Sequence, residues 1–156
     1  MNASLSGLPS ITVRRATPQE IVDLRWRILR QGLPRSEAIF AGDELPTSLH
    51  FAAAAGDHIV CCATMHLNEY DKQPAYQLRG MATDDGSRGA GLGTRVLSAM
   101  EAAVLAETAI RQLWCNARTP ALNFYRKQGW EVRSEVFEIP TAGPHVRMAK
   151  RLGWSE

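Results

Sequence analysis

The segment Ser87–Met100 reads SRGAGLGTRVLSAM and places three glycines, Gly89, Gly91 and Gly93, at the start of a stretch with helical spacing. Each glycine weakens a helix by about 1 kcal/mol relative to alanine, so this placement requires an explanation. The first turn of a helix has backbone N–H groups without internal partners, and the helix dipole adds partial positive charge there. Glycines allow an anion to approach these groups closely. The segment therefore predicts a cradle for a phosphate or pyrophosphate, to which Arg88 adds a charged donor; the alternative is a flexible turn.

Two known phosphate-binding loops do not fit this segment. A dinucleotide-binding loop, Gly-x-Gly-x-x-Gly, requires a third glycine where this chain has Thr94 or Val96. A P-loop requires lysine and then serine or threonine after its last glycine, but Gly93 is followed by Thr94 and Arg95. The sequence excludes both loops, and a different pattern must account for the glycines.

The composition indicates one globular domain. We expect residues 1–10 to form a disordered leader and residues 11–156 a single domain, since 156 residues with 45% hydrophobic content suffice for a sizeable core. No apolar run reaches the ~20 residues of a membrane span, so no membrane partner is expected. Cys61, Cys62 and Cys115 match neither a disulfide framework nor a zinc site, which predicts a cytoplasmic protein without a metal. The net charge of +2 argues against a nucleic-acid partner.

Local patterns predict an α+β domain. Residues 17–20, TPQE, form a capping-box signature for a helix that ends near Gly32. The dipeptide Gly56-Asp57 is typical of a hairpin turn. Hairpins followed by a strand–helix–strand unit indicate a mixed sheet. The expected strands are residues 11–17, 48–55, 58–67, 75–83, 110–117, 130–139 and 145–152.

The glycine segment resembles the acetyl-CoA loop of the GNAT superfamily of N-acetyltransferases, Gln/Arg-x-x-Gly-x-Gly/Ala, which Arg88–Gly93 matches in full. A second GNAT signature, (Phe/Leu)-Tyr-x-Lys-x-Gly-(Phe/Trp), is matched by Phe124–Trp130. The resemblance implies an α+β fold with a mixed, mostly antiparallel sheet of six to seven strands flanked by about four helices. It also implies acetyl transfer from acetyl-CoA to a primary amine of a small molecule or peptide, by direct attack in a ternary complex.

The resemblance also assigns roles to individual residues. Tyr125 matches the family tyrosine that protonates the leaving thiolate, which suits a phenol with a reference pKa near ~10; the alternative is a packing role. Asn116 and Asn123 are expected beside the cofactor, although Asn116 also fits a strand-terminal cap. Arg118 stands where the commonest family pattern has asparagine. The backbone of Met81, Ala82 and Thr83 is expected to pair with pantetheine, and the pyrophosphate to lie on the N–H groups of Arg88, Gly89, Gly91, Gly93 and Thr94.

The sequence does not identify the general base. An ammonium must lose a proton before it attacks a thioester, and the candidates for accepting that proton are His66, Glu69, His145 or a water chain.

The acceptor pocket of similar proteins is made by the first helices and the last hairpin. Gln77 and Arg79 share a strand face with Met81, and Arg79 is a candidate to bind an acidic group on the acceptor. Trp26 is expected either to line this pocket or to lie in the core. The first helices contribute a mixture of charges that indicates no particular acceptor: Arg25, Arg27, Arg30, Asp43 and Glu44.

Two other functions fit the same motifs. One is an acyl-CoA-binding regulatory module of this fold without turnover, and the other is a transferase that uses another acyl donor, such as succinyl-CoA. Apolar positions between Trp130 and Leu152 also favour a homodimer that pairs through its last strands.

Overall fold

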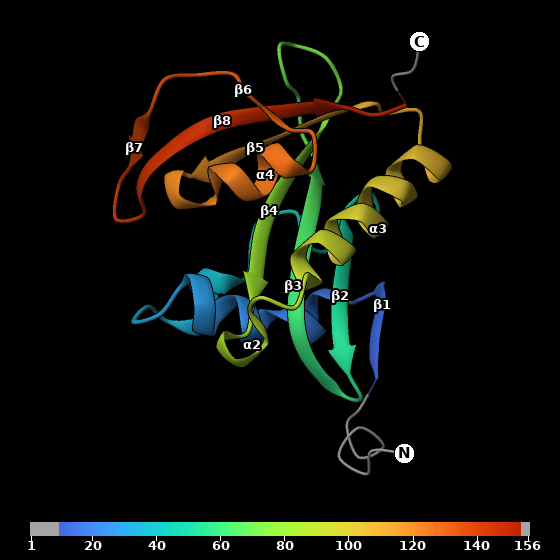
Figure 1. The fold of residues 1–156 in the computed structure, drawn as a ribbon, viewed down its shortest axis with the longest axis vertical. Helices are drawn as coiled ribbons and strands as arrows, with labels where there is room; N and C mark the ends of the chain where they lie inside the picture. The colour runs from blue at the N-terminus through green and yellow to red at the C-terminus, as the bar shows by residue number, and fades with distance from the viewer. Residues whose placement is uncertain (1–9, 154–156) are drawn as a thin grey trace.

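The structure is a computed structural model that describes residues 10–153 (Figure 1). The predicted leader lies outside the described residues except for Ser10. Within the described range, no helix is long and apolar enough to cross a membrane. In chain order the elements are β1 (Ile11–Arg15), α2 (Pro18–Leu29), the 3-10 helix η1 (Arg35–Ala38), β2 (Leu49–Ala55), β3 (His58–Leu67), β4 (Tyr76–Thr83), η2 (Asp85–Ser87), α3 (Leu92–Glu107), β5 (Gln112–Arg118), η3 (Thr119–Ala121), α4 (Leu122–Lys127), β6 (Glu131–Val132), β7 (Phe137–Ile139) and β8 (Gly143–Arg151).

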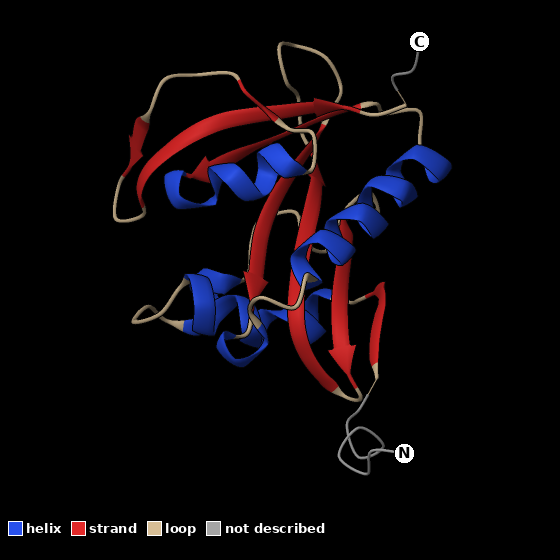
Figure 2. Cartoon of the chain, in the orientation of Figure 1, coloured by secondary structure: helices blue, strands red, loops and turns tan. Residues whose placement is uncertain are grey.

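The strands form one mixed sheet in the order β1-β2-β3-β4-β5-β8-β6, and β7 also pairs with β8. Among the described strands, only β4 and β5 pair in parallel. Helices α2 and α3 cover opposite faces of the first strands, and α4 lies beside β5 and β8 (Figure 2). The predicted α+β class with a mostly antiparallel mixed sheet is confirmed, with eight strands and three α-helices in the described residues.

The strand count exceeds the expected six to seven because residues 130–139 do not form one strand. They form β6 and β7, each of which pairs with β8. The ladder breaks where the backbone N–H of Arg147 donates to the side-chain Oγ of Ser134 at 2.8 Å. A hydroxyl here takes the place of a backbone carbonyl, so regular pairing stops at Ser134.

The local sequence signals in the first half of the chain form the structures that they predict. Thr17 caps α2 by accepting from Glu20 N at 3.2 Å, and Glu20 Oε1 accepts from Thr17 N at 2.8 Å, which completes the predicted capping box. The turn between β2 and β3 contains Gly56 at a φ of +62°. These two signals set the position of α2 and the register of the central hairpin.

The core holds β3 and β4 between the two long helices. Cys61 packs with α3 residues such as Val96, whereas Cys62 packs with Ile21 of α2. Neighbouring residues of a strand point to opposite faces, so each face of β3 is buried against one helix. Each fully buried side chain of the size of Val96 or Ile21 stabilises the fold by about 1.5–3 kcal/mol. This packing makes β3 and β4 a rigid wall for the site.

Candidate active site

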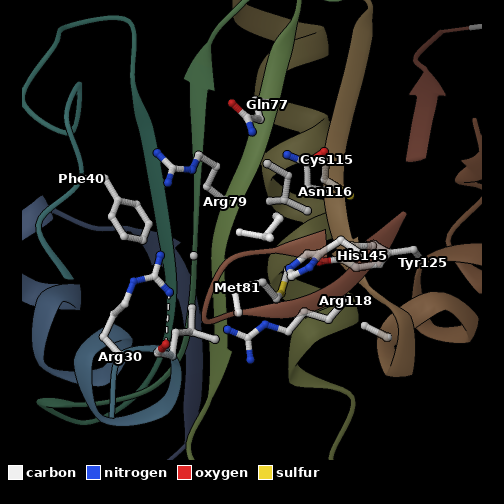
Figure 3. A pocket seen from close by; sticks show the side chains of 17 residues that line it. Arg30, Phe40, Gln77, Arg79, Met81, Cys115, Asn116, Arg118, Tyr125 and His145 are labelled. Carbon is white, nitrogen blue, oxygen red and sulfur yellow. Dashed lines mark hydrogen bonds between the residues drawn. The ribbon is translucent and has the colours of Figure 1, made fainter. Parts of the chain in front are cut away.

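Strands β4 and β5 separate after a short stretch of parallel pairing. Their described register contains two pairs, Tyr76 with Leu113 and Gln77 with Trp114. Beyond these pairs a cavity of about 320 Å³ lies between the two strands (Figure 3), at the lower end of the range for small-molecule sites. The residues that line it are Leu29, Arg30, Phe40, Gln77, Leu78, Arg79, Gly80, Met81, Cys115, Asn116, Ala117, Arg118, Ala121, Tyr125, Ile139, Ala142 and His145.

The glycine segment forms an open cradle at the start of α3. Gly91 is the N-cap at a φ of +75°, and Gly89 has a φ of +83°, a conformation that residues with side chains rarely adopt. No side chain caps this helix, so the N–H groups of its first turn have no partner within the helix. A Cβ atom placed on either glycine meets no atom within 4 Å. The cradle therefore has free donors and the open space that a diphosphate needs, with the Arg88 guanidinium 3.2 Å from Asp85 at its entrance.

The cradle lies directly against α4 and the end of β4. A Cβ atom on Gly93 lies 3.2 Å from the ring of Phe124 and 3.9 Å from the sulfur of Met81, so glycine allows the close approach. Thr94 Oγ1 accepts a hydrogen bond from Gln128 Nε2 at 3.0 Å. The two segments that the motifs singled out therefore meet beside Met81 of β4.

Tyr125 presents its phenol to the cavity from α4. Its ring packs against Phe124 and Trp130, with centroid distances of 5.1 and 5.6 Å. Burial raises the pKa of Tyr125 well above its usual value, and Cys115 adds to the effect. Within the described residues, the hydroxyl forms no hydrogen bond to a protein group. It is a protonated donor that faces an open cavity.

His145 lines the same cavity from β8 and is buried, at 5% exposure. Its Nδ1 lies 2.8 Å from the carbonyl oxygen of Gly143, which can only accept, so Nδ1 carries the proton. In the neutral ring Nε2 then has the free lone pair. Phe137 stacks on the ring at 6.3 Å, and Arg118 is its partner across the β5–β8 ladder. This orientation suits a proton acceptor.

The other two candidates for the base lie elsewhere. His66 is buried and donates from Nε2 to Asp43 Oδ1 at 2.9 Å. Glu69 is exposed in the connection between β3 and β4. Neither lines the cavity, so among the three candidate side chains only His145 shares it with Tyr125.

The remaining predicted cofactor residues lie in three places. Met81 and Asn116 line the cavity, and Asn116 Oδ1 accepts from Arg147 Nε at 3.3 Å. Ala82 and Thr83 continue β4 from the cavity toward the cradle, and Ala82 is buried beneath α2. Asn123 is exposed on α4 and does not line the cavity.

A bulge in β4 brings the strand close to a buried arginine. The register between β3 and β4 shifts between Cys62 and Thr64, and the residue at the shift, Gly80, has a φ of +66°. A Cβ atom there lies 2.9 Å from Arg25 Nε and 3.2 Å from the ring of Phe40. Only glycine fits this bulge without displacing its neighbours.

Arg25 and Asp43 were expected to supply the acceptor pocket, but they form a buried pair outside it. Arg25 NH1 donates to Asp43 Oδ2 at 2.7 Å, and Arg25 NH2 donates to Thr64 Oγ1 at 2.7 Å. Burial alone raises the pKa of Asp43, but hydrogen bonds from His66, Arg25 and the N–H of Phe40 outweigh it and hold the pKa well below its usual range. This network fixes the segment after α2 against β3.

The other charged residues expected at the pocket also differ in placement. Arg30 lines the cavity, whereas Arg27 pairs with Asp84 at 3.2 Å and Glu44 accepts from Gln19 at 2.9 Å. Trp26 donates from Nε1 to Leu33 O at 2.7 Å and is half-buried outside the cavity. Of the first helices, the end of α2 and the segment after it thus reach the site.

Phe40 is a cavity residue that sequence reasoning missed. Its ring lies beneath the guanidinium carbons of Arg25, Arg79 and Arg30, at 3.8, 4.3 and 5.0 Å from the centroid. It follows η1 in a stretch without periodic apolar spacing, and its contacts come from distant parts of the chain. A lone aromatic residue in a segment rich in polar residues is the one sequence signal that could have indicated it.

The matches to known sequences agree with this geometry. Residues 46–132, more than half of the chain, match the family model described as acetyltransferase (GNAT) domain. The chain is also 30% identical over 145 residues to the uncharacterized N-acetyltransferase YitI of Bacillus subtilis (strain 168). This similarity covers 91% of the chain and 97% of the relative.

Solved structures share the fold at low sequence identity. An aminoglycoside 6'-N-acetyltransferase complexed with coenzyme A has a TM-score of 0.73 at 15% identity, covering 93% of this chain and 99% of that one. FeeM, an N-acyl amino acid synthase from uncultured soil microbes, has a TM-score of 0.74 at 15% identity, covering 92% of both chains. Together, the domain match, the similarity to YitI and the shared fold show that this chain belongs to the GNAT family of acetyltransferases.

Proposed function

We propose that this protein transfers an acetyl group from acetyl-CoA to the primary amine of a small molecule or peptide, by direct attack in a ternary complex. The observation that carries the proposal is the meeting of the open cradle, the unpaired edge of β4 and the phenol of Tyr125 around one cavity. Family membership supports the reaction class.

The chain fits an acyl-CoA along a continuous path. The backbone N–H groups of Arg88, Gly89, Gly91, Gly93 and Thr94 hold the diphosphate at the cradle. The open edge of β4 at Met81, Ala82 and Thr83 offers backbone groups to the pantetheine arm, and Asn116 adds a polar side chain; Asn123 is assigned only a peripheral contact, because it is exposed. When bound, acetyl-CoA supplies an activated thioester.

Tyr125 acts as the general acid. Its raised pKa keeps the proton on Oη at neutral pH, and its hydroxyl faces the cavity without a protein partner in the described residues. A proton donated from Oη neutralises the thiolate that leaves as the amide bond forms.

His145 acts as the general base. The hydrogen bond from Nδ1 to Gly143 O leaves Nε2 as the acceptor, and Phe137 fixes the plane of the ring. Nε2 takes the proton from the acceptor's ammonium, directly or through one water, so that the amine attacks in its neutral form.

The cellular location and the oligomeric state of the protein stay predictions. The cysteines of the described chain are free and buried, which accords with a reducing cytoplasm. A homodimer through the last strands is consistent with the exposure of Val136 at 60% between β6 and β7.

Coenzyme A binding by calorimetry, combined with thiol release from acetyl-CoA across an amine panel, tests the proposal. Binding together with amine-dependent thiol release supports it. Binding without release for any amine indicates a regulatory module, and faster release from succinyl-CoA indicates another acyl donor. Absence of coenzyme A binding refutes the proposed function.

A further inference from the structure

The cavity is strongly cationic. Arg30 at the end of α2, Arg79 on β4 and Arg118 at the end of β5 line it, and no aspartate or glutamate of the described chain does. These three residues come from separate parts of the sequence, so their convergence is a property of the fold. A site with this charge selects against a purely cationic amine and favours a ligand with negative charge.

The three guanidinium groups have no carboxylate partner within the described residues. Arg30 donates from NH1 to the adjacent Leu29 O at 3.1 Å, and Arg79 and Arg118 form no side-chain hydrogen bond. Elsewhere in the described chain, arginines such as Arg14 and Arg35 pair with carboxylates at 2.9 and 2.8 Å. The cavity therefore brings together three arginines whose charge no carboxylate among its described lining residues compensates.

The arginines repel one another. Burial lowers the pKa of Arg30, and the nearby charges of Arg118 and Arg25 lower it further. Burial also lowers the pKa of Arg79, with further contributions from Arg30 and Arg25. An anion placed between these groups relieves both the repulsion and the loss of solvation.

Phe40 holds two of these groups in position. Arg79 and Arg30 lie over its ring at 4.3 and 5.0 Å, a cation–π arrangement that leaves their N–H edges free to donate. Phe40 is itself buried, and its N–H donates to Asp43 Oδ2 at 2.9 Å. In Figure 3, Arg30, Phe40 and Arg79 lie on one side of the cavity, opposite His145 and Tyr125.

We propose that the acceptor is a small amine that also carries a carboxylate, such as a free amino acid, and that Arg30, Arg79 and Arg118 bind the carboxylate. This inference rests on the proposed function. Guanidinium groups bind carboxylates through paired, charge-assisted hydrogen bonds. The carboxylate lies toward Phe40, the amine then lies toward His145 Nε2, and a cavity of about 320 Å³ limits the acceptor to a small molecule.

Matched acceptor pairs test the inference. Glycine, β-alanine, 4-aminobutyrate, L-leucine and L-phenylalanine are each compared with the corresponding amide, and 1,4-diaminobutane serves as the cationic amine. We expect the best acid to exceed its amide by about tenfold or more in kcat/KM, because the amide lacks the charge that the arginines bind. Calorimetry on the coenzyme A complex should also detect the N-acetyl product of the best acid.

Variants separate binding of the carboxylate from general charge effects. Arg79→Gln and Arg30→Gln should each raise KM for the best acid by about tenfold, with the dissociation constant of coenzyme A unchanged and the preference for acid over amide reduced. Arg35→Gln removes one positive charge at an exposed pair with Asp23 and should change none of these values.

The outcomes distinguish this inference from the proposed function. Coenzyme A binding with preferential acetylation of amides or of the diamine overturns the carboxylate assignment and leaves the acetyltransferase intact. Coenzyme A binding with neither acetylation nor product binding for any acid also overturns it. Failure to bind coenzyme A refutes the proposed function itself.

Discussion

Gln128 donates a 3.0 Å hydrogen bond from Nε2 to Thr94 Oγ1, and this bond ties the end of α4 to the first turn of α3. The helix that begins at the glycine cradle is thereby fixed to the helix that carries Tyr125. The distance between the two parts of the proposed site is set by this contact and by Gly93, whose Cβ position lies 3.2 Å from the Phe124 ring. These contacts fix the position of the cradle relative to the phenol.

Gly91→Val should abolish coenzyme A binding. The substitution places a branched side chain in the open space of the cradle, at a φ of +75° where valine is strained by about 1–3 kcal/mol. Isothermal calorimetry measures the binding, and circular dichroism verifies the fold. Gly86→Val is the matched control, since Gly86 also has open space around it but lies outside the cradle. Wild-type affinity in Gly91→Val rules the cradle out.

Tyr125→Phe should lower kcat by about a hundredfold or more while coenzyme A affinity is nearly unchanged, because only the proton donor is lost. The ring contacts to Phe124 and Trp130 are retained. Steady-state kinetics with the best amine provide the measurement. Tyr76→Phe removes a hydroxyl that donates to Thr47 O at 2.9 Å, and its turnover should match wild type. An unchanged kcat in Tyr125→Phe contradicts the role of the phenol.

His145→Gln should remove the acidic limb of the pH profile of kcat/KM. A protonated imidazole cannot accept a proton, so the wild-type rate should fall toward acid pH. The variant should be slower at neutral pH and recover at high pH, where the amine loses its proton to solvent. His58→Gln, a change at an exposed residue 3.4 Å from Asp84, should keep the wild-type profile. An acidic limb that persists in His145→Gln indicates a different base, such as a water chain.

Asp43→Asn should destabilise the protein by about 3–5 kcal/mol at pH 7, because Arg25 is left as an uncompensated buried charge. Since the pKa of Asp43 in the folded state lies below its usual value of 3.8, the stabilisation is fully present above that value and is lost as pH falls. Urea denaturation from pH 7 to pH 2 should therefore show a constant difference between the two proteins above about pH 4 and a difference that shrinks below it. The exposed Asp23→Asn serves as control, and a pH-independent difference contradicts the charged pair.

The sequence predicts the local parts of this molecule well. The capping box at Thr17, the hairpin turn at Gly56 and the helix start at Gly91 each depend on residues that are neighbours in the chain. The break at Ser134 was missed because it depends on a hydrogen bond to Arg147, thirteen positions away. Propensity and spacing contain no information about such a partner.

The residues of the arginine-lined side of the cavity can also be divided into those that the sequence pattern predicts and those that only the tertiary fold brings together. Alternation predicted that Gln77 and Arg79 share a strand face with Met81, but the bulge at Gly80 reverses the alternation. Arg79 packs on Phe40 on the α2 side of the sheet, whereas Met81 packs against the core on the α3 side, and all three still line the cavity. That Arg118 and Phe40 join them follows only from the tertiary arrangement of β5 and the segment after α2. The buried pairing of Arg25 with Asp43 was likewise invisible, because the sequence does not show which charges will meet.

The close approach of Gly80 to Arg25 has a consequence for the evolution of this protein. A side chain at position 80 collides with the guanidinium, so the two positions cannot drift independently. Lineages that replace the glycine must also replace or reorient Arg25. Such a change also alters the contact between Arg25 and the ring of Phe40. Positions 25 and 80 should therefore covary among descendants of a common ancestor, and their joint identity should mark the lineages that inherited this cavity.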